Sequence, residues 1–310
     1  MTSPVICIGA AMVDELFFCQ QTAIAATSNP AILQKSAGGV VSNIAQHIGL
    51  LQIPVLLLTV LGKDSDGEWL ENVCKMRGVD TECFLKVNEP TGKYVSIIQP
   101  DGSLYTAACA DISGKYLTPQ FLLSHNSFLQ NASFIIGDTN ITIEALNWLS
   151  EFCLQHTIKL IVEPVSVEKA KKLSLVNLSG IFMLTPNEDE LPSLCLEEHN
   201  NTEKCIKELL QRGVEYVWLR KGKNGSEVYN KKGSIRLGTE DIQMLDSTGA
   251  GDAALAGWVA ANHLGLSQMK CLQAGHSMAY EVLQVKGAII ESLSKKTFIQ
   301  LIQKYYPDAE

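Results

Sequence analysis

Short, continuously apolar runs alternate with stretches of helical spacing along most of the chain. The apolar runs, which we predict to be strands, are Val5 to Ile8, Val55 to Leu61, Phe134 to Ile136, Leu160 to Val162, Ile181 to Leu184 and Tyr216 to Leu219. Helical spacing covers 43–51, 66–77, 142–155, 187–194 and 201–212. Apolar strands followed by amphipathic helices are typical of a parallel sheet covered on both faces. The pattern therefore predicts an α/β fold with a doubly wound, mostly parallel sheet sandwiched by helices.

Two regions break this alternation, at about 15–37 and 93–110. In the second, residues 94–98 and 103–107 flank the turn at 99–102, which predicts a β-hairpin. Because both regions adjoin early strands, we expect them to meet as a small β-sheet lid over a site, inserted into one domain spanning 1–310. The exposed edge of such a lid could also pair two copies of the chain into a homodimer.

Charge and composition narrow the choice of partners. The formal net charge of −8 argues against nucleic acid, which requires many cationic contacts. The longest aliphatic stretch, Val55 to Leu61, is far too short to span a membrane. The nine cysteines are scattered without a C-x-x-C pair, which favours free thiols in a reducing compartment. We therefore expect a cytoplasmic protein that acts on a small molecule.

The segment Asp246 to Asp252 places small residues and an acid before a helix-prone stretch without proline. Gly249, Ala250 and Gly251 would let the backbone approach a ligand, and the first N–H groups of a helix are a preferred site for phosphate. Because a carboxylate repels a bound polyanion, we interpret Asp252 as a general base. The alternative is that the glycines only pack a helix against the sheet and that Asp252 favours the helix dipole.

The same letters also satisfy a dinucleotide-binding fingerprint, through Gly249, Gly251 and Ala254. That motif requires a following strand that ends in an acid, whereas residues 253–283 have the spacing of one helix followed by another. A nicotinamide oxidoreductase is therefore the less favoured interpretation. The sequence also has no Walker-type loop, so any phosphate would be bound by a different device.

Small and polar residues follow the first predicted strand. Asp14 lies near the carboxyl end of that strand, where ligands bind in open α/β sheets, and a carboxylate can accept from two vicinal hydroxyls. Gly38 and Gly39 open a helix that carries Asn43, whose amide both donates and accepts. A surface acid and a simple chain reversal are the structural alternatives.

Two later strands are followed by comparable residues. Asn187 and Glu190 have the spacing of a capping box, and water-mediated magnesium binding is their functional alternative. Gly222 and Gly225 follow the strand that ends at Leu219 and could border a nucleotide.

Taken in order, these segments resemble the ribokinase-like (PfkB-type) sugar and nucleoside kinases, and the resemblance spans essentially residues 4 to 291. It rests on an amino-terminal signature at 38–45 and a carboxy-terminal signature at 246–252. The resemblance implies a phosphotransferase that uses ATP and Mg²⁺. Asp252 would deprotonate the acceptor hydroxyl, and the amides of Gly249, Ala250, Gly251 and Asp252 would form an anion hole.

The resemblance also implies binding roles for other residues. The acceptor would be held by Asp14, Gly38, Gly39 and Asn43. Magnesium, through water, would be bound by Asn187 and Glu190. The ATP site would include Asn187, Glu190, Gly222, Gly225, Thr248 and His276. A monovalent cation such as K⁺ would be bound by Asp246, Val282 and Gly287.

Several strings within the family likeness are similar to those of pseudouridine kinases, at 28–30, 91–92, 110–112, 138–141 and 164–169. This similarity implies pseudouridine as the acceptor, phosphorylated on its 5′-hydroxyl. Its uracil-like ring requires amide or acid partners. We expect the residues that bind it to be Thr91, Asp111, Asp138 and Asn140.

Four residues depart from the family pattern: Ser42 for arginine, Gln52 for a helix-ending glycine, Glu163 for aspartate, and the bulky Trp258. Ser42 bears on the substrate, because the loss of a guanidinium could change a base or sugar contact. Another nucleoside, ribose or a ketose is therefore an alternative acceptor. A non-catalytic nucleoside-binding protein is an alternative of another class.

Overall fold

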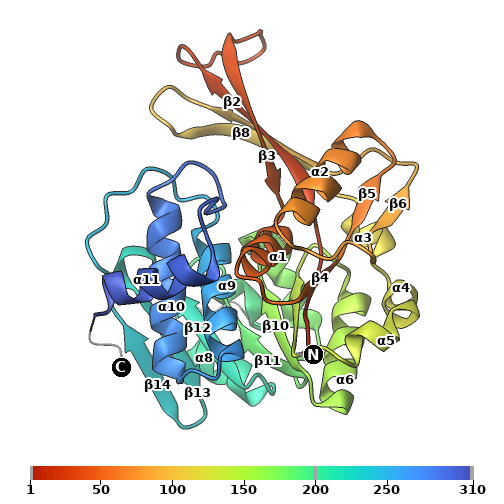
Figure 1. Ribbon diagram of the computed structural model, residues 1–310, viewed down its shortest axis with the longest axis vertical. Helices are drawn as coiled ribbons and strands as arrows, with labels where there is room; N and C mark the ends of the chain where they lie inside the picture. Colours follow the sequence, from red (N-terminus) through yellow and green to blue (C-terminus); the bar gives the residue numbers. More distant parts are fainter. Residues whose placement is uncertain (1–2, 198–200, 308–310) are drawn as a thin grey trace.

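The protein is described by a computed structural model at residues 3–197 and 201–307; the outermost residues of the predicted 1–310 domain lie outside this description. One large sheet lies at its centre (Figure 1). Its strands are β1 (Val5–Ile8), β4 (Val55–Leu58), β9 (Phe134–Asp138), β10 (Lys159–Glu163), β11 (Ile181–Leu184), β12 (Tyr216–Arg220), β13 (Ser226–Asn230) and β14 (Gly233–Leu237).

The strand order in this sheet is β14-β13-β12-β11-β10-β9-β1-β4. Neighbours from β4 to β12 pair in parallel, and β13 and β14 add an antiparallel edge. The predicted α/β class and mostly parallel sheet are confirmed. Because β1, β9, β10, β11 and β12 run parallel, their carboxyl ends lie at one edge of the sheet, where ligands of such sheets bind.

Helices cover both faces of the sheet. One face carries α1 (Val40–Leu50), α9 (Ala250–His263), α10 (Gln268–Leu283) and α11 (Lys295–Tyr305), with α2 (Ser65–Met76) beside α1. The other carries α4 (Pro119–Ser124), α5 (Asn126–Leu129), α6 (Ile143–His156), α7 (Val167–Ala170) and α8 (Thr202–Gln211). Shorter turns are α3 (Ser113–Tyr116), η1 (Lys171–Leu175), η2 (Leu191–Leu194) and η3 (Gly222–Asn224).

The apolar strands supply two cores, one on each face of the sheet. In β1, Val5 and Cys7 join the core beneath α1 and α9, while Ile6 and Ile8 join the core beneath α6 and α8. This follows from the alternation of side chains along a strand. All nine cysteines lie within the described residues as free thiols, and Cys109 is the exposed one among them.

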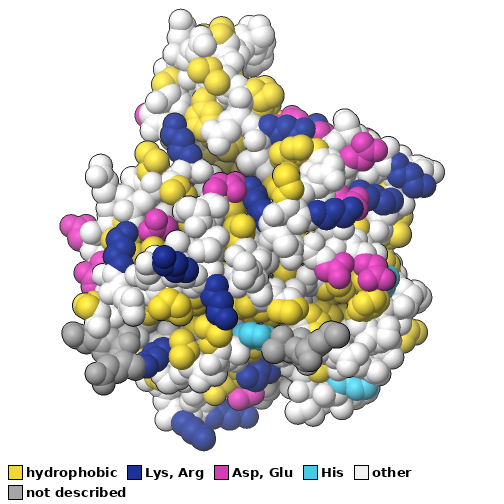
Figure 2. Space-filling view, viewed as in Figure 1, with side chains coloured by type: hydrophobic (Ala, Val, Ile, Leu, Met, Phe, Trp, Pro, Cys, Tyr) yellow, Lys and Arg dark blue, Asp and Glu magenta, His cyan; other side chains and the backbone are white. Residues whose placement is uncertain are grey.

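The two regions that break the strand–helix alternation form one small sheet that projects from the body (Figure 1). Its strands are β2 (Met12–Cys19), β3 (Ala31–Gly38), β7 (Lys93–Ile98) and β8 (Leu104–Ala110), in the order β3-β2-β7-β8. Lys35 and Lys93 join it to Asp66 of α2 with Nζ–carboxylate distances of 2.5 and 2.8 Å. Figure 2 shows hydrophobic side chains on this projection. Ile32, Leu33 and Leu104 of its strands are exposed.

Two predicted elements are wrong. The run Val55 to Leu61 is not one strand, because the chain leaves the large sheet at Thr59 and continues as β5 (Val60–Gly62), which pairs with β6 (Leu85–Val87). The predicted helix at 187–194 is only the 3₁₀ turn η2. Pro192 has no N–H to donate within a helix, which explains the short turn.

Among the described residues, no helix combines the length and apolar character that crossing a bilayer requires.

Helix α1 ends in a left-handed residue that is not glycine. Gln52 has φ 58°, its N–H donates to Gly49 O, and the N–H of Ile53 donates to Ile48 O. These paired bonds form a Schellman motif, in which glycine is the usual residue at the position of Gln52. The family departure at Gln52 therefore places a side chain where the backbone disfavours one.

Replacement of Gln52 with glycine is expected to increase the free energy of unfolding by about 0.5–1 kcal/mol, because relief of left-handed strain exceeds the added entropy of the unfolded chain. Urea denaturation measures this change. Gln52→Ala is the matched control, since alanine keeps the strain; an equal gain in both variants would contradict the explanation.

Candidate active site

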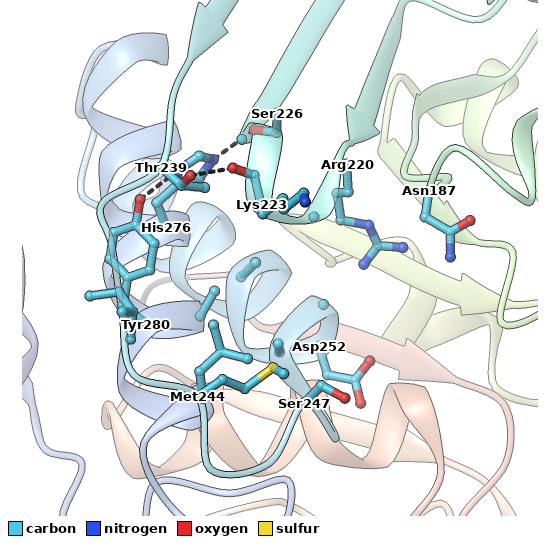
Figure 3. A pocket seen from close by; sticks show the side chains of 18 of the residues that line it. Asn187, Arg220, Lys223, Ser226, Thr239, Met244, Ser247, Asp252, His276 and Tyr280 are labelled. Carbon is cyan, nitrogen blue, oxygen red and sulfur yellow. Dashed lines mark hydrogen bonds between the residues drawn. The ribbon is translucent and has the colours of Figure 1, made fainter. Parts of the chain in front are cut away.

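A cavity of about 900 Å³ opens at the carboxyl ends of β10 and β12, beside the first turn of α9. Figure 3 shows Asn187, Arg220 and Asp252 on one side of it, and His276, Tyr280 and Met244 on the other. The first group is polar and charged, whereas the second presents rings and an apolar chain. The cavity thus has one end suited to phosphate chemistry and one suited to a flat heterocycle.

The first turn of α9 brings the small residues and the acid of the carboxy-terminal signature to this cavity. Gly249 caps the helix in the left-handed conformation with φ 75°. Ala250, Gly251 and Asp252 line the cavity. The first N–H groups of a helix lack acceptors within it, so these residues can offer donors to an anion.

Asp252 is held by Asn43 of α1, whose Nδ2 donates to Asp252 Oδ2 at 2.9 Å. Burial raises the pKa of Asp252 to about 7, and the charges of Glu163 and Asp138 act in the same direction. The bond from Asn43 and the charge of Arg220 oppose this rise. A carboxyl with a pKa near neutrality can accept and release a proton, as a general base must.

The side-chain oxygen of Asn43 is an unused hydrogen-bond acceptor. Its Oδ1 is buried and finds no hydrogen-bond partner among the residues that the structure describes. A buried acceptor without a partner costs stability, so this atom, next to Asp252, is suited to a ligand donor such as a hydroxyl.

Arg220, at the end of β12, lies directly over this turn. A Cβ at Gly251 would overlap its Nη1, so a larger residue there would displace the guanidinium. Its Nη2 donates to Glu163 Oε1 at 2.6 Å and also to the carbonyl of Thr185, and it lies 4.0 Å from Glu190 Oε2. Figure 3 shows the guanidinium pointing into the cavity.

Glu163 is oriented by the turn that follows β10. Val165 has φ 69° and lies at the centre of a γ-turn, in which the N–H of Ser166 donates to Pro164 O at 2.8 Å. This conformation is strained for a β-branched residue and is found mostly at functional sites. The hydroxyl of Thr185 donates to the second oxygen of Glu163, so both of its carboxylate oxygens are engaged.

Asn187 and Glu190 form the reciprocal pair that the capping-box spacing predicts. Asn187 Oδ1 accepts from the N–H of Glu190 at 2.8 Å, and Glu190 Oε2 accepts from the N–H of Asn187 at 2.9 Å. Burial raises the pKa of Glu190, as does the neighbouring Glu163.

Both residues line the cavity, so this donor set fits a magnesium ion held through water molecules. Within residues 3–197 and 201–307, no cluster of three or more His, Cys, Asp or Glu side chains could ligate a metal directly.

The other end of the cavity is lined by residues that the sequence assigned to ATP. Gly222, Gly225 and His276 are all there. Ser226 Oγ lies 2.7 Å from His276 Nε2, and burial lowers the pKa of His276 to about 4, so the ring is neutral at pH 7 (Figure 3). Thr248 is exposed and its N–H donates to Asp246, while the neighbouring Ser247 lines the cavity in its place.

Asp14 lies on β2 against the glycine pair that precedes α1. A Cβ at Gly38 would overlap its carboxylate, and Gly39 caps α1 with φ 97°. Burial raises the pKa of Asp14 to about 7. Asp14, Gly38 and Gly39 therefore lie together at the amino-terminal end of α1, the helix that carries Asn43.

A second polar cluster lies at the end of β9. Asp138 accepts from the backbone N–H of Asn140 at 3.0 Å and from its side chain at 2.7 Å. Lys169 of α7 donates to Asn140 Oδ1. Burial raises the pKa of Asp138 to about 7, and Asp111 adds to this while Lys169 opposes it. The cluster brings together three of the residues predicted to bind the acceptor: Asp111, Asp138 and Asn140.

Two other residues face away from these clusters. The Thr91 hydroxyl accepts from Gly62 N at 2.9 Å and donates to Asp64 Oδ1 at 2.6 Å, which favours a structural role for Thr91. Ser42 is fully buried and its hydroxyl accepts from Gln46 Nε2 at 3.0 Å. The serine at this position therefore packs within α1, and the proposed effect of the missing guanidinium on the substrate stays a prediction.

The predicted monovalent-cation residues are only partly brought together. Asp246 accepts from Gly287 N at 3.0 Å and from Thr248 N at 2.9 Å. Burial acts to raise the pKa of Asp246, but these backbone bonds lower it overall. Val282 is buried within α10, and its carbonyl accepts from Val285 N at 3.1 Å.

Arg220 and Lys169 are site residues that sequence reasoning missed. Lys169 lies in the string at 164–169, which resembles pseudouridine kinases. Its position shortly after the strand that precedes Glu163 could have indicated a role at the site. Arg220 gave a similar signal, because it follows an apolar strand and precedes Gly222 and Gly225, which the sequence predicts to border a nucleotide.

Residues 3–296 match the family model described as pfkB family carbohydrate kinase. The chain is 31% identical over 261 residues to a pseudouridine kinase of Escherichia coli, covering 82% of each chain. It is 25% identical over 268 residues to a ribokinase of Staphylococcus aureus, covering 84% of this chain and 86% of that one. The solved structure of Arabidopsis thaliana ribokinase complexed with ribose and ATP has a TM-score of 0.83 at 24% identity, covering 98% and 99% of the two chains.

Proposed function

Because the chain belongs to the pfkB family of carbohydrate kinases, which are phosphotransferases, we propose that it transfers the γ-phosphate of ATP to the 5′-hydroxyl of pseudouridine. The 31% identity to a pseudouridine kinase supports this acceptor. The observation that carries the proposal is the contact between Asn43 and Asp252, which joins the two signature segments at the mouth of the α9 helix.

In this proposal Asp252 accepts the proton of the 5′-hydroxyl as its oxygen attacks the γ-phosphorus. The N–H groups of Gly249, Ala250, Gly251 and Asp252 stabilise charge on the transferring phosphoryl group. The spare acceptor of Asn43 can receive a hydroxyl of the ribose. Asp14 would accept from its 2′- and 3′-hydroxyls, while Gly38 and Gly39 let the sugar approach the backbone.

The cluster at the end of β9 supports a nucleoside as the acceptor. Asp138, Asn140 and Lys169 supply acid, amide and ammonium groups at one place, and Asp111 lies near them. A uracil ring presents N–H donors and carbonyl acceptors that such groups can satisfy. Ribose alone has no ring with such donors and acceptors, so it would not use this cluster.

The same proposal includes the cofactors. Asn187 and Glu190 would hold Mg²⁺ through water, and that ion would offset charge on the ATP phosphates. The Asp246 loop would bind K⁺ through Asp246 and the carbonyls of Val282 and Gly287. We further propose that β8, whose seven residues are all exposed at the edge of the small sheet, pairs two copies of the chain over the acceptor site.

A panel of acceptors tests the proposed reaction. Phosphorylation of pseudouridine, uridine, adenosine, ribose and fructose is measured by ADP release with and without Mg²⁺. We expect the highest kcat/KM with pseudouridine, because its ring meets the cluster at the end of β9, and little turnover without Mg²⁺.

Ribose kinase activity is the second candidate, supported by the 25% identity to a ribokinase. Equal or better turnover of ribose would remove pseudouridine as the acceptor and retain the kinase. Absence of ADP release with every acceptor would contradict the catalytic proposal itself.

A further inference from the structure

The ion pair with Glu163 explains only part of the position of Arg220. Its Nη2 makes the contacts to Glu163 and Thr185, and its Nη1 lies over Gly251 in the predicted anion hole. Its buried Nε finds no partner within the described part of the chain. The guanidinium therefore has donors that Glu163 and Thr185 do not use, and one of them, Nη1, lies at the first turn of α9.

The charges around Arg220 require such a cation. Glu163, Glu190 and Asp252 surround it, and all three line the cavity. A polyphosphate brought beside three carboxylates would be repelled at this end of the cavity. Lys223 lines the cavity with the nucleotide-binding glycines, and His276 is neutral at pH 7. Arg220 thus supplies the positive charge next to the first turn of α9.

We propose that Arg220 is a catalytic residue that contacts the phosphoryl group in transfer, with Glu163 as the positioning residue that holds its guanidinium. This inference rests on the proposed kinase function of the same site. As the acceptor oxygen forms its bond to phosphorus, the bond to the ADP oxygen breaks, and the hydroxyl proton goes to Asp252. While Nη2 stays with Glu163 and Thr185, Nη1 can donate charge-assisted hydrogen bonds to the phosphoryl oxygens at the first turn of α9.

Kinetics of Arg220→Met test the proposal. We expect kcat to fall about 10²- to 10³-fold, as when one preorganised donor to a transition state is removed. The affinity for ADP, measured by calorimetry, should change less than about fivefold, because ADP lacks the group that Arg220 contacts. The acid limb of the pH profile should move to higher pH, because the charge that opposes protonation of Asp252 is gone.

A transition-state mimic gives a second measurement that does not depend on turnover. ADP with aluminium fluoride, Mg²⁺ and the best acceptor of the panel should raise the melting temperature of the wild type above that with ADP alone. Arg220→Met should lose this extra rise, and Arg220→Lys should retain part of it. Arg236→Met is the matched control, since it removes an exposed arginine of β14 on the same sheet and should behave as wild type.

Two results would overturn the proposal. One is a kcat of Arg220→Met within threefold of wild type with the fluoroaluminate effect intact. The other is loss of ADP binding and of stability in Arg220→Met, matched by Glu163→Gln, which would assign both residues to the structure alone. A wild type that phosphorylates none of the acceptors would instead remove the proposed function, so the two failures are distinct.

Discussion

Asp252→Asn is expected to reduce kcat roughly 10³- to 10⁴-fold while the affinities for ADP and for the acceptor change little. Asparagine keeps the shape and the bond from Asn43 but cannot accept a proton, so the loss falls on the chemical step. Steady-state kinetics and calorimetry measure the two effects separately. A non-catalytic nucleoside-binding protein has no need of a base, and an unchanged rate would end the assignment of Asp252.

The pH dependence of the same residue has a definite sign. With saturating acceptor, the wild-type kcat should rise with pH through about 7, because Asp252 must lose its proton to act as a base. The Asp252→Asn variant should lack this rise. Burial raises the pKa in the folded state, so between about pH 4 and 7 the folded protein holds a proton that the unfolded chain has released, and ionisation costs stability.

Asp252→Asn should for that reason be more stable than the wild type at pH 7 and above, and a higher melting temperature would accompany its loss of activity. The ionised carboxylate of Asp252 would then lower the stability of the fold while it serves the reaction. A variant that is both inactive and less stable would indicate that Asp252 supports the fold through Asn43.

Asp14→Asn is the second change with a large expected effect. It should lower kcat/KM for the acceptor roughly 10²- to 10³-fold, because a carboxylate that accepts from two vicinal hydroxyls makes two charge-assisted hydrogen bonds. Most of the loss should appear in KM, since these hydroxyls do not react. The affinity for ADP should be unchanged, because the nucleotide end of the cavity is lined by other elements.

A substrate lacking one hydroxyl provides the matched control for Asp14. With 2′-deoxypseudouridine the wild type should already have lost part of the interaction, so the further effect of Asp14→Asn should be smaller. An equal loss with both acceptors would show that Asp14 does not contact the 2′-hydroxyl. Burial also raises the pKa of Asp14 to about 7, so the wild-type KM for the acceptor should fall as pH rises through that value.

Local patterns predicted much of the fold and of the site. The alternation of apolar runs and helical spacing is a property of neighbouring residues, and it led to the parallel sheet and to the helices on its faces. The segment at 246–252 likewise predicted an anion site by itself, because small residues and an acid at the start of a helix are a local pattern. Its position in the cavity agrees with that interpretation.

Long-range contacts account for what sequence reasoning missed. Arg220 directly follows the predicted strand that ends at Leu219, and its place over Gly251 arises only when β12 and α9 are packed together. The burial of Ser42 likewise follows from the orientation of α1, which a local pattern does not give. The helix expected at 187–194 failed because Pro192 limits the turn after the reciprocal bonds of Asn187 and Glu190.

The sequence by itself determined the class of fold and the chemical groups available at the helix mouth, because hydrophobic periodicity and small-residue motifs act over a few neighbouring residues. Only the tertiary structure decided which of these groups share an environment. Burial and the charges of distant segments set the pKa values of Asp252 and Asp14. They also decide that Asn43 keeps an acceptor, and Arg220 a donor, without a partner in the described residues. Desolvation and Coulomb interactions are set by distance in space, and that distance exists only once the sheet and its helices are assembled.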